Sequence, residues 1–224
     1  MPGNLKAFAA ELLGTFALVL IGAGAVCMDS ITGGRLGLTG IAFAHGLTIM
    51  VMVFALGPVS GGHFNPAVTV ALFATRRLDL VRTVGYILSQ LVGAALGGLF
   101  LLRILHNYDL VGNPPFLGSC DLSGIGFKGG AAVEAVITFL LMTVVFATAV
   151  DDDRKTPFAP VAIGMTITLD ILFAGALTGG AINPARAFGP ALASGHWANH
   201  PVYWIGPLVG AAAAALLYDN VFRK

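Results

Sequence analysis

Hydrophobic positions in this chain form long uncharged blocks rather than the short alternations of a soluble domain. The five longest stretches without Asp, Glu, Lys or Arg cover residues 12–28, 36–75, 83–102, 135–150 and 187–218. About 20 apolar residues are enough to cross the hydrocarbon core of a bilayer as a helix. Read together with the turn residues, the blocks predict six membrane-spanning helices. We expect these helices over residues 5–28, 37–56, 82–105, 130–150, 158–177 and 201–222.

Two further apolar pieces, residues 66–76 and 184–194, are only about half as long as a bilayer requires. Each follows an Asn-Pro-Ala step, which comprises Asn65, Pro66 and Ala67 in the first copy and Asn183, Pro184 and Ala185 in the second. Proline suits the first turn of a helix and asparagine caps its start. The glycine pairs just upstream favour an extended chain, which membrane depth tolerates only inside protein or beside water. The pattern therefore predicts two re-entrant half-helices and an aqueous pathway.

The two halves of the chain repeat each other. Residues 9–26 parallel residues 131–150, with Glu11 matched by Glu134, and residues 85–101 parallel residues 202–218. Because each half contributes three spans, the second half must enter the membrane from the opposite side, which makes an inverted repeat. We expect an all-α membrane protein with six transmembrane helices and two re-entrant half-helices. It would form a single domain over residues 1–224, with repeats at about 1–105 and 129–224.

Composition and charge narrow the class of function. The chain is 57% hydrophobic and 10% charged, against roughly 25% charged residues in a soluble domain. Its net charge of +1 comes from scattered residues, so no nucleic-acid partner is expected. No catalytic triad, metal-ligand spacing or phosphate-binding loop occurs, so the sequence predicts neither an enzyme nor a metal or cofactor. The two cysteines, Cys27 and Cys120, are isolated thiols by default, and a bridge between them is the alternative.

Loop charge predicts the orientation of the chain in the membrane. With the N-terminus inside, eight basic residues face the cytoplasm and three face outward. The cytoplasmic set is Lys6, Arg76, Arg77, Arg82, Arg154, Lys155, Arg223 and Lys224, and the outer set is Arg35, Arg103 and Lys128. We therefore expect both termini in the cytoplasm and the protein in the cell membrane.

Two half-helices that meet N-terminus to N-terminus place positive dipole ends at the bilayer centre, which disfavours cations. The amides of Asn65 and Asn183 could hold the oxygen of a passing molecule, so that water passes while its proton chain is interrupted. The matched acids Glu11 and Glu134 suggest either proton coupling or structural support. Asp170 points about 100° away from the next residue, Ile171, on a helix. We expect its side chain to anchor a loop and not to line the pathway.

Four motifs carry a resemblance to a known family: AELLGT at 10–15, SGGHFNPAVT at 60–69, TGGAINPAR at 178–186 and VYWIGPLVGA at 202–211. Over almost its whole length the chain resembles the aquaporins, or major intrinsic proteins. Within the family it is most similar to microbial or archaeal aquaporins of the tonoplast-intrinsic-protein type, as in HGLT at 45–48.

The resemblance implies a role for each site residue. The selectivity filter would consist of His45, Ile171, Gly180 and Arg186. Gly61, Gly62, His63, Gly179 and Ala181 would offer a ladder of carbonyl groups, and Glu11 and Glu134 would support the re-entrant loops. It also implies a homotetramer in the lipid bilayer, with one pore per subunit.

The implied function is a passive water channel that excludes protons and ions. The His, Ile, Gly, Arg set is similar to that of members implicated in ammonia passage. The third loop, however, offers Leu117, Ser119 and Cys120 where related ammonia-permeable proteins add a histidine. One alternative is a glycerol facilitator, although Ala187 follows the filter arginine where glycerol-conducting members carry Asp. The other is a gradient-coupled transporter, since these also use inverted repeats and broken helices.

Overall fold

Six apolar helices cross the bundle in the computed structural model, which describes residues 3–223. Three are single helices: α3 (Gly37–Ser60), α5 (Leu80–Ile104) and α7 (Ala159–Thr178). The other three are extended by a π-helical turn. They combine α1 (Gly3–Leu18), η1 (Val19–Ala23) and α2 (Gly24–Ile31); α6 (Phe127–Val145) and η3 (Phe146–Val150); and α9 (Val202–Leu217) and η4 (Tyr218–Phe222). The six expected spans are thereby confirmed, with ends that differ by a few residues.

The end of α3 shows what sets a helix boundary here. The sequence predicted a stop at residue 56, before Gly57 and Pro58, but the helix continues to Ser60 with Pro58 inside it. It ends where Gly61 adopts a φ of 93° and donates its N–H to the Gly57 carbonyl at 2.8 Å. Glycine tolerates this left-handed conformation. The terminating residue is therefore the glycine of the re-entrant loop and not the proline.

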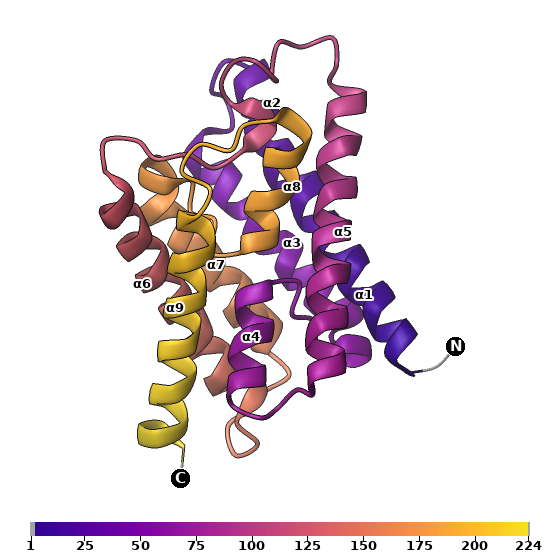
Figure 1. Cartoon of the computed structure of the whole chain (residues 1–224), viewed down its shortest axis with the longest axis vertical. Coiled ribbons are helices and arrows are strands. Elements are labelled where there is room, and N and C mark those ends of the chain that lie inside the picture. The colour runs from indigo at the N-terminus through magenta and orange to yellow at the C-terminus, as the bar shows by residue number, and fades with distance from the viewer. Residues whose placement is uncertain (1–2, 224) are drawn as a thin grey trace.

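The two half-helices, α4 (Pro66–Ala74) and α8 (Pro184–Ser194), are stacked one above the other in the middle of the molecule (Figure 1). Asn65 caps α4 by accepting the Ala67 N–H at 2.8 Å, and Asn183 caps α8 by accepting the Ala185 N–H at 3.0 Å. Each proline takes the first helical position. These features confirm the predicted re-entrant elements.

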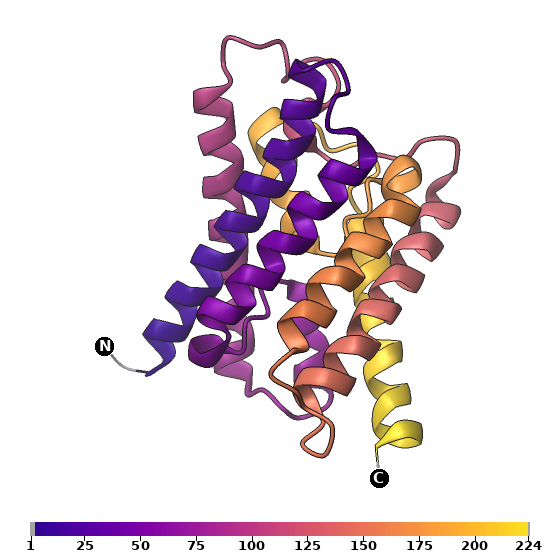
Figure 2. The ribbon, with the colours of Figure 1, turned by 180° about the vertical axis from the view of Figure 1, so that it is seen from behind.

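Glycines let the helices cross closely. A Cβ atom on Gly46 of α3 would lie 2.4 Å from the Gly164 carbonyl oxygen of α7, and one on Gly164 would lie 2.5 Å from the Gly46 oxygen. Gly93 of α5 approaches the backbone of α1 in the same way, and Gly210 of α9 approaches that of α6. Seen from behind, α1 and α3 of the first half lie beside α7 and α6 of the second (Figure 2). Small residues thus set the spacing of the helices.

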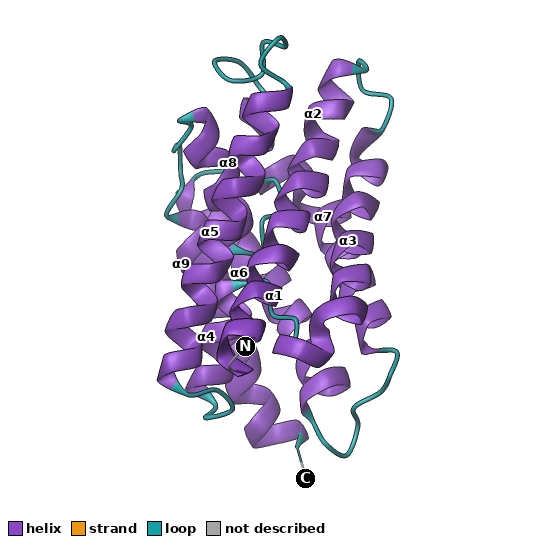
Figure 3. Cartoon of the chain, turned by 90° about the vertical axis from the view of Figure 1, so that its right-hand side faces the viewer, coloured by secondary structure: helices purple, strands orange, loops and turns teal. Residues whose placement is uncertain are grey.

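Loops lie at both ends of the bundle, and short loop segments also enter its interior (Figure 3). The long connection between α5 and α6 contains the short helix η2 (Phe116–Gly118) and covers the end of the bundle opposite the chain termini (Figure 1). Lys224, one of the residues expected on the cytoplasmic side, lies outside the described residues.

Candidate functional site

A cavity of about 570 Å³ runs through the interior of the bundle. At one end it is lined by His45 and Arg186, and at the other by Arg76, Arg77 and Arg223. Between these ends its walls come from the re-entrant loops and from α1, α3, α4, α6 and α7. The remaining lining includes Leu18, Ile49, Val53, Gly61, Gly62, His63, Asn65, Val68, Leu72, Leu141, Val145, Ile163, Ile167, Ile171, Ala181, Ile182 and Asn183.

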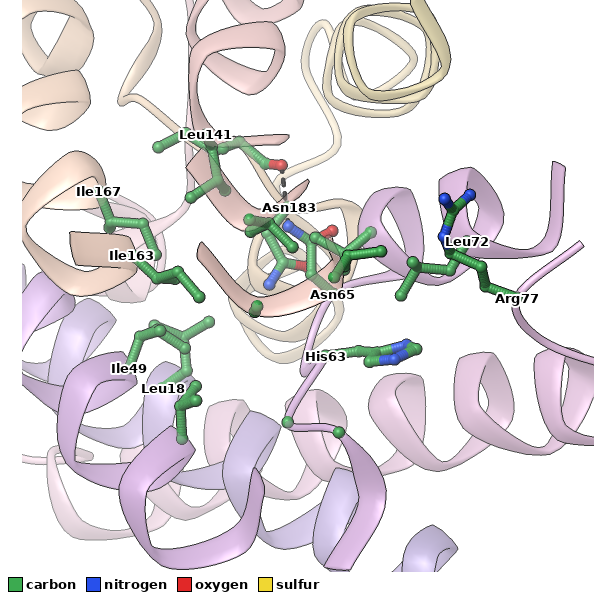
Figure 4. Close-up of a pocket in the computed structure, with 18 of the residues that line it drawn as sticks. Leu18, Ile49, His63, Asn65, Leu72, Arg77, Leu141, Ile163, Ile167 and Asn183 are labelled. Carbon is green, nitrogen blue, oxygen red and sulfur yellow. Dashed lines mark hydrogen bonds between the residues drawn. The ribbon is translucent and has the colours of Figure 1, made fainter. Parts of the chain in front are cut away.

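One wall of the cavity is apolar except for His45, and α3 and α7 form it by presenting every fourth residue to the cavity. On α3 these residues are His45, Ile49 and Val53, and on α7 they are Ile163, Ile167 and Ile171. Residues four apart lie on one helix face. Figure 4 shows Leu18, Ile49, Ile163 and Ile167 on one side of the space and Asn65 and Asn183 on the other. A molecule in the cavity therefore meets polar groups mainly on the side of the re-entrant loops.

The two asparagine amides lie where the half-helices meet. Asn65 Nδ2 donates to the Ile182 carbonyl at 3.2 Å, and Asn183 Nδ2 donates to the Phe64 carbonyl at 2.7 Å. An amide nitrogen carries two hydrogens, so each asparagine keeps one for the cavity that it lines. Phe64 and Ile182 have positive φ angles of 49° and 59°, which are unfavourable for these residue types and typical of functional sites.

Each re-entrant loop is held by one buried carboxyl group. Glu11 accepts hydrogen bonds from Ser60 Oγ at 2.6 Å, from the backbone of His63 at 3.0 Å and Phe64 at 2.7 Å, and from Gln90 at 2.7 Å. In the second half, Glu134 accepts hydrogen bonds from Thr178 Oγ1 at 2.6 Å and from the backbone of Ala181 and Ile182 at 2.9 and 2.7 Å. Both glutamates are fully buried, and neither lines the cavity.

Arg186 is fixed by three of its five N–H groups. Nε donates to His45 Nε2 at 3.2 Å, and Nη1 donates to the Gly118 carbonyl and to Cys120 Sγ, both at 2.9 Å. Nη2 makes no hydrogen bond to the residues described, although Arg186 lines the cavity and only 3% of it is exposed. Its two hydrogens are therefore available to a molecule in the cavity.

His45 is held as a neutral acceptor by its two contacts. Because Nδ1 lies 2.9 Å from the Ile41 carbonyl, which can only accept, Nδ1 carries the hydrogen. Nε2 is then free to accept from Arg186. Gly22 makes room for the ring, since a Cβ atom there would lie 2.5 Å from His45 Cδ2.

The other predicted site residues divide into two groups. Gly61, Gly62, His63 and Ala181 line the cavity, whereas Gly179 and Gly180 do not. A Cβ atom on Gly180 would lie 3.2 Å from Ile171 Cγ1, so this glycine packs behind the isoleucine. The remaining residues of the Asn-Pro-Ala steps are buried and shape the helix starts. They are Pro66, Ala67, Pro184 and Ala185.

Sequence reasoning named Leu117, Ser119 and Cys120 in the loop between α5 and α6 only because they stand where related proteins add a histidine, and it did not foresee that this loop holds Arg186. Gly118 and Cys120 contact Arg186 directly, and no periodic pattern marked them in advance. Burial raises the pKa of the Cys120 thiol to about 11, against the opposing charge of Arg186, so the thiol is neutral at physiological pH. Cys27 and Cys120 are both buried and free, so the alternative of a bridge between them is not formed.

Asp121, next to Cys120, is an anchor of this loop. Its carboxylate lies 2.8 Å from His196 Nε2 and accepts from Asn199 Nδ2 at 3.0 Å. Burial raises the pKa of Asp121, but hydrogen bonds from Asn199, the Leu122 N–H and His196 outweigh this and lower it below its ordinary value. The anchoring hydrogen bonds therefore persist on acidification and are lost only when the pH falls through that lowered pKa.

The expectation that Asp170 anchors a loop is wrong. Its side chain is buried, and within residues 3–223 its Oδ2 atom has no hydrogen-bond partner. The second re-entrant loop is instead bonded to Glu134 and Thr178.

The family model described as major intrinsic protein matches residues 1–218. The chain is 43% identical to Aquaporin TIP4-4 of Zea mays over 226 aligned positions, which cover 98% of this chain and 88% of the relative. It is 40% identical to Probable aquaporin TIP3-2 of Arabidopsis thaliana, with 97% and 84% covered. Among solved structures, the aquaglyceroporin from Plasmodium falciparum superposes with a TM-score of 0.88 at 25% identity, covering 98% of this chain and 97% of that one.

The relatives also bear on the host membrane. They are tonoplast-type aquaporins, so they do not support the expected location in the cell membrane. Insertion itself is clear, because six helices are long and apolar enough to cross a bilayer. With the expected fold, half-helices and family motifs all in place, this multi-pass membrane protein belongs to the major intrinsic protein family, the aquaporins.

Proposed function

We propose that this chain is a passive water channel that excludes protons and ions and works without a cofactor or catalysis. The observation that carries the proposal is the pair of amides at the meeting point of the half-helices. Each of Asn65 and Asn183 has one hydrogen bonded to the opposite loop and one available to the cavity. Family membership supports a channel for water or small solutes.

The geometry gives a physical reason for excluding protons. A water oxygen that accepts from both amides has its own hydrogens directed away from the meeting point. It therefore cannot pass a proton along the row of water molecules in the pore. The positive ends of two helix dipoles and the charge of Arg186 add an electrostatic barrier to cations.

We propose that His45, Ile171 and Arg186 line the selectivity filter, with Gly180 packed behind Ile171, and that Gly61, Gly62, His63 and Ala181 form the carbonyl ladder, to which Gly179 does not contribute because it does not line the cavity. Support comes from the contact between His45 and Arg186, from Ile171 in the cavity wall and from the packing of Gly180 behind it. With both nitrogens of His45 engaged, Arg186 Nη2 is the donor offered to a solute. The aliphatic wall to which Ile171 belongs suits ammonia as a second solute.

We further propose a single channel domain with inverted repeats at about 1–105 and 129–224, both termini in the cytoplasm, and a homotetramer in the bilayer. The matched hydrogen bonds of Glu11 and Glu134 support the repeat. Large apolar side chains on the outer surface, such as Leu88, Phe173 and Val209, suit contact with lipid or neighbouring subunits.

Osmotic shrinkage of vesicles that contain the purified protein tests the proposal. We expect water permeability well above that of empty vesicles and unchanged by an imposed proton or sodium gradient. A rate equal to that of empty vesicles, at normal insertion, would remove the channel. Dependence on a gradient would favour a coupled transporter, and glycerol flux comparable to water flux would favour a glycerol facilitator.

A further inference from the structure

One end of the cavity, here called the inner mouth, is lined by four charged side chains, which are Arg76, Arg77, Asp152 and Arg223. Arg77 makes a bidentate pair with Asp219, and Asp152 accepts a hydrogen bond from Lys155 at 2.8 Å. Within residues 3–223, the side chains of Arg76 and Arg223 make no hydrogen bond or ion pair. Among the lining side chains and their partners, two positive charges therefore remain without a counter-charge.

Arg76 occupies a position where glycine is usual. It follows α4 and has a φ angle of 61°, the left-handed conformation that commonly ends a helix. Three backbone N–H groups that follow α4 already bond to three of its last four carbonyl groups, at distances of 2.8 to 3.1 Å. The Arg76 side chain is therefore not needed to cap the helix, and it lines the mouth instead.

Arg77 holds together the elements around this mouth. Besides its pair with Asp219 of η4, its Cζ atom lies 4.9 Å from the ring centroid of Phe146 of η3. Arg223 follows η4 directly and donates its N–H to the Tyr218 carbonyl at 3.0 Å. In Figure 4, Arg77 lies at the opposite side of the space from the labelled isoleucines. The backbone that carries Arg223 is thus attached to the same frame as Arg77.

The inner mouth already stabilises one negative charge. The hydrogen bond and the charge of Lys155 lower the pKa of Asp152, and the charges of Arg223 and Arg77 add smaller contributions in the same direction. The Asp152 carboxylate is bonded to Lys155 and to neither of these arginines. The electrostatic field of the mouth therefore favours anions, while the guanidinium group of Arg223 keeps its donors for another partner.

Phosphate is the anion that this arrangement suits best. A phosphate monoester carries a charge of about −1.5 to −2 at pH 7, which matches the two uncompensated positive charges. The planar guanidinium group bonds phosphate oxygens in pairs and is only weakly hydrated. The lining next to the arginines is apolar and could contact the carbon part of an organic phosphate; it includes Leu72, Val145, Ala149 and Val150.

We propose that the inner mouth binds a phosphate monoester through Arg76 and Arg223, and that the bound anion obstructs the passage of water. The headgroup of an anionic lipid and a dissolved organic phosphate share this chemistry, and the experiment separates the two sources. Binding is independent of the proposed channel function, whereas the obstruction rests on it.

Thermal unfolding in a neutral detergent tests the binding. The probe is inorganic phosphate, compared with sodium chloride at equal ionic strength, which supplies screening alone. Two charge-assisted contacts support a Kd on the order of 1 mM. At about 10 mM phosphate we then expect the unfolding temperature of the wild type to rise by about 3 °C relative to chloride.

The variant that removes the site is Arg76→Gln combined with Arg223→Gln, and it should show no such rise. The matched control is Arg82→Gln. Arg82 carries a guanidinium group on the same expected side of the membrane, but it donates to Asn4 at 3.0 Å and does not line the cavity. The control should respond to phosphate as the wild type does.

Osmotic shrinkage of vesicles tests the obstruction. With about 10 mM phosphate on both sides of phosphatidylcholine vesicles, we expect water permeability to fall about three-fold or more, because a site with a Kd on the order of 1 mM is then mostly occupied. A second series replaces part of the phosphatidylcholine by phosphatidic acid, which has a monoester headgroup, or by phosphatidylglycerol, which has a diester headgroup. A fall with phosphatidic acid alone identifies the lipid as the source, and a fall with dissolved phosphate alone identifies a soluble ligand.

The outcomes for binding, obstruction and channel function are separate. An unfolding temperature that rises no more in phosphate than in chloride would overturn the binding site, as would an equal rise in the double variant. A rise in the wild type with unchanged water permeability in every series would overturn the obstruction. Absence of water permeation in the wild type without phosphate would refute the proposed channel, while the rise in unfolding temperature would still support the binding site.

Discussion

At the scale of single residues, Glu11 and Glu134 satisfy backbone N–H groups that the re-entrant loops cannot pair by themselves. Unpaired backbone groups at membrane depth cost several kcal/mol each. Glu11 is the acceptor in all four of its hydrogen bonds, two at each carboxylate oxygen. Its carboxyl group is therefore fully engaged in holding the loop and its surroundings. This arrangement argues against a carboxyl group that cycles through protonation, as a coupled transporter would need.

Glu11→Gln should destabilise the protein by about 2–4 kcal/mol, because one carboxylate oxygen is replaced by a donor that faces other donors. Thermal unfolding in detergent measures the effect. The matched control is Asp170→Asn, a change at a buried carboxyl group whose Oδ2 atom has no hydrogen-bond partner in the described part of the chain. Equal losses of stability in the two variants would show that the hydrogen bonds to Glu11 are not what holds the first loop.

The filter assignment predicts the behaviour of the double variant His45→Phe with Ile171→His. Phenylalanine removes the acceptor of the Arg186 Nε–H, and histidine adds a polar group to the wall that Ile171 lines. The narrower, more polar constriction should lower ammonia and glycerol permeability relative to water by about ten-fold, which corresponds to about 1.4 kcal/mol in barrier height. Side-by-side vesicle assays check this, and an unaltered ratio would mean that these side chains do not form the constriction.

At the scale of elements, the crossing of α3 and α7 places the apolar stripes that line the cavity. Gly46→Ala would put a methyl group 2.4 Å from the backbone oxygen of Gly164. Since backbone of two spans must then separate, we expect a loss of about 1–3 kcal/mol in stability together with reduced water permeability. In the control Gly57→Ala, on the same helix, the nearest atom is Val53 Cγ1 at 3.5 Å. If both variants behaved like the wild type, the crossing of α3 and α7 would not be tight.

Much of this element structure could be predicted from the sequence. Long uncharged blocks marked the six spans, and the Asn-Pro steps marked the half-helices, because proline and asparagine have strong positional preferences at helix starts. The internal repeat showed that Glu11 and Glu134 occupy matching positions in the two halves of the chain. What the sequence could not show was that α3 would continue through Pro58, since the left-handed turn at Gly61 and not the proline ends it.

The conformation of the segment Phe116–Cys120 and its contacts with Arg186 escaped prediction for a physical reason. Its left-handed backbone is carried by Phe116 and Leu117, residue types without a preference for that conformation, and is imposed by contacts with residues more than 70 positions away, such as His196. Local sequence carries no signal for such tertiary constraint. The failed expectation for Asp170 has the same origin, because the direction of a side chain on a helix does not specify its partner.

At the scale of the whole molecule, six spans return the chain to the side on which it began, and both described ends lie in the lower half of the view (Figure 1). The basic residues Arg76, Arg77 and Arg223 line the cavity mouth on that side. Arg77 is held there by a bidentate pair with Asp219, with both nitrogen–oxygen distances 2.7 Å. Asp152 lines the same mouth, so the cytoplasmic orientation predicts an inner mouth that carries both signs of charge, with Arg76 and Arg223 not paired, among the described residues, as Arg77 is.

Tags placed at the two ends test this orientation. In inverted membrane vesicles from an expression host, a protease added outside should remove both tags, since both would lie on the former cytoplasmic face. Right-side-out vesicles should protect both tags. Cleavage in the opposite preparation would reverse the assignment, and cleavage of one tag alone would contradict an even number of spans.

A density map of the wild-type protein in lipid, at a resolution that shows ordered water, tests the hydrated pore directly. We predict a water oxygen about 3 Å from both Asn65 Nδ2 and Asn183 Nδ2, within a continuous file that runs from Arg186 to the inner mouth. A dry constriction at that point, or amides turned away from the cavity, would show that the two half-helices do not meet around a hydrated pore.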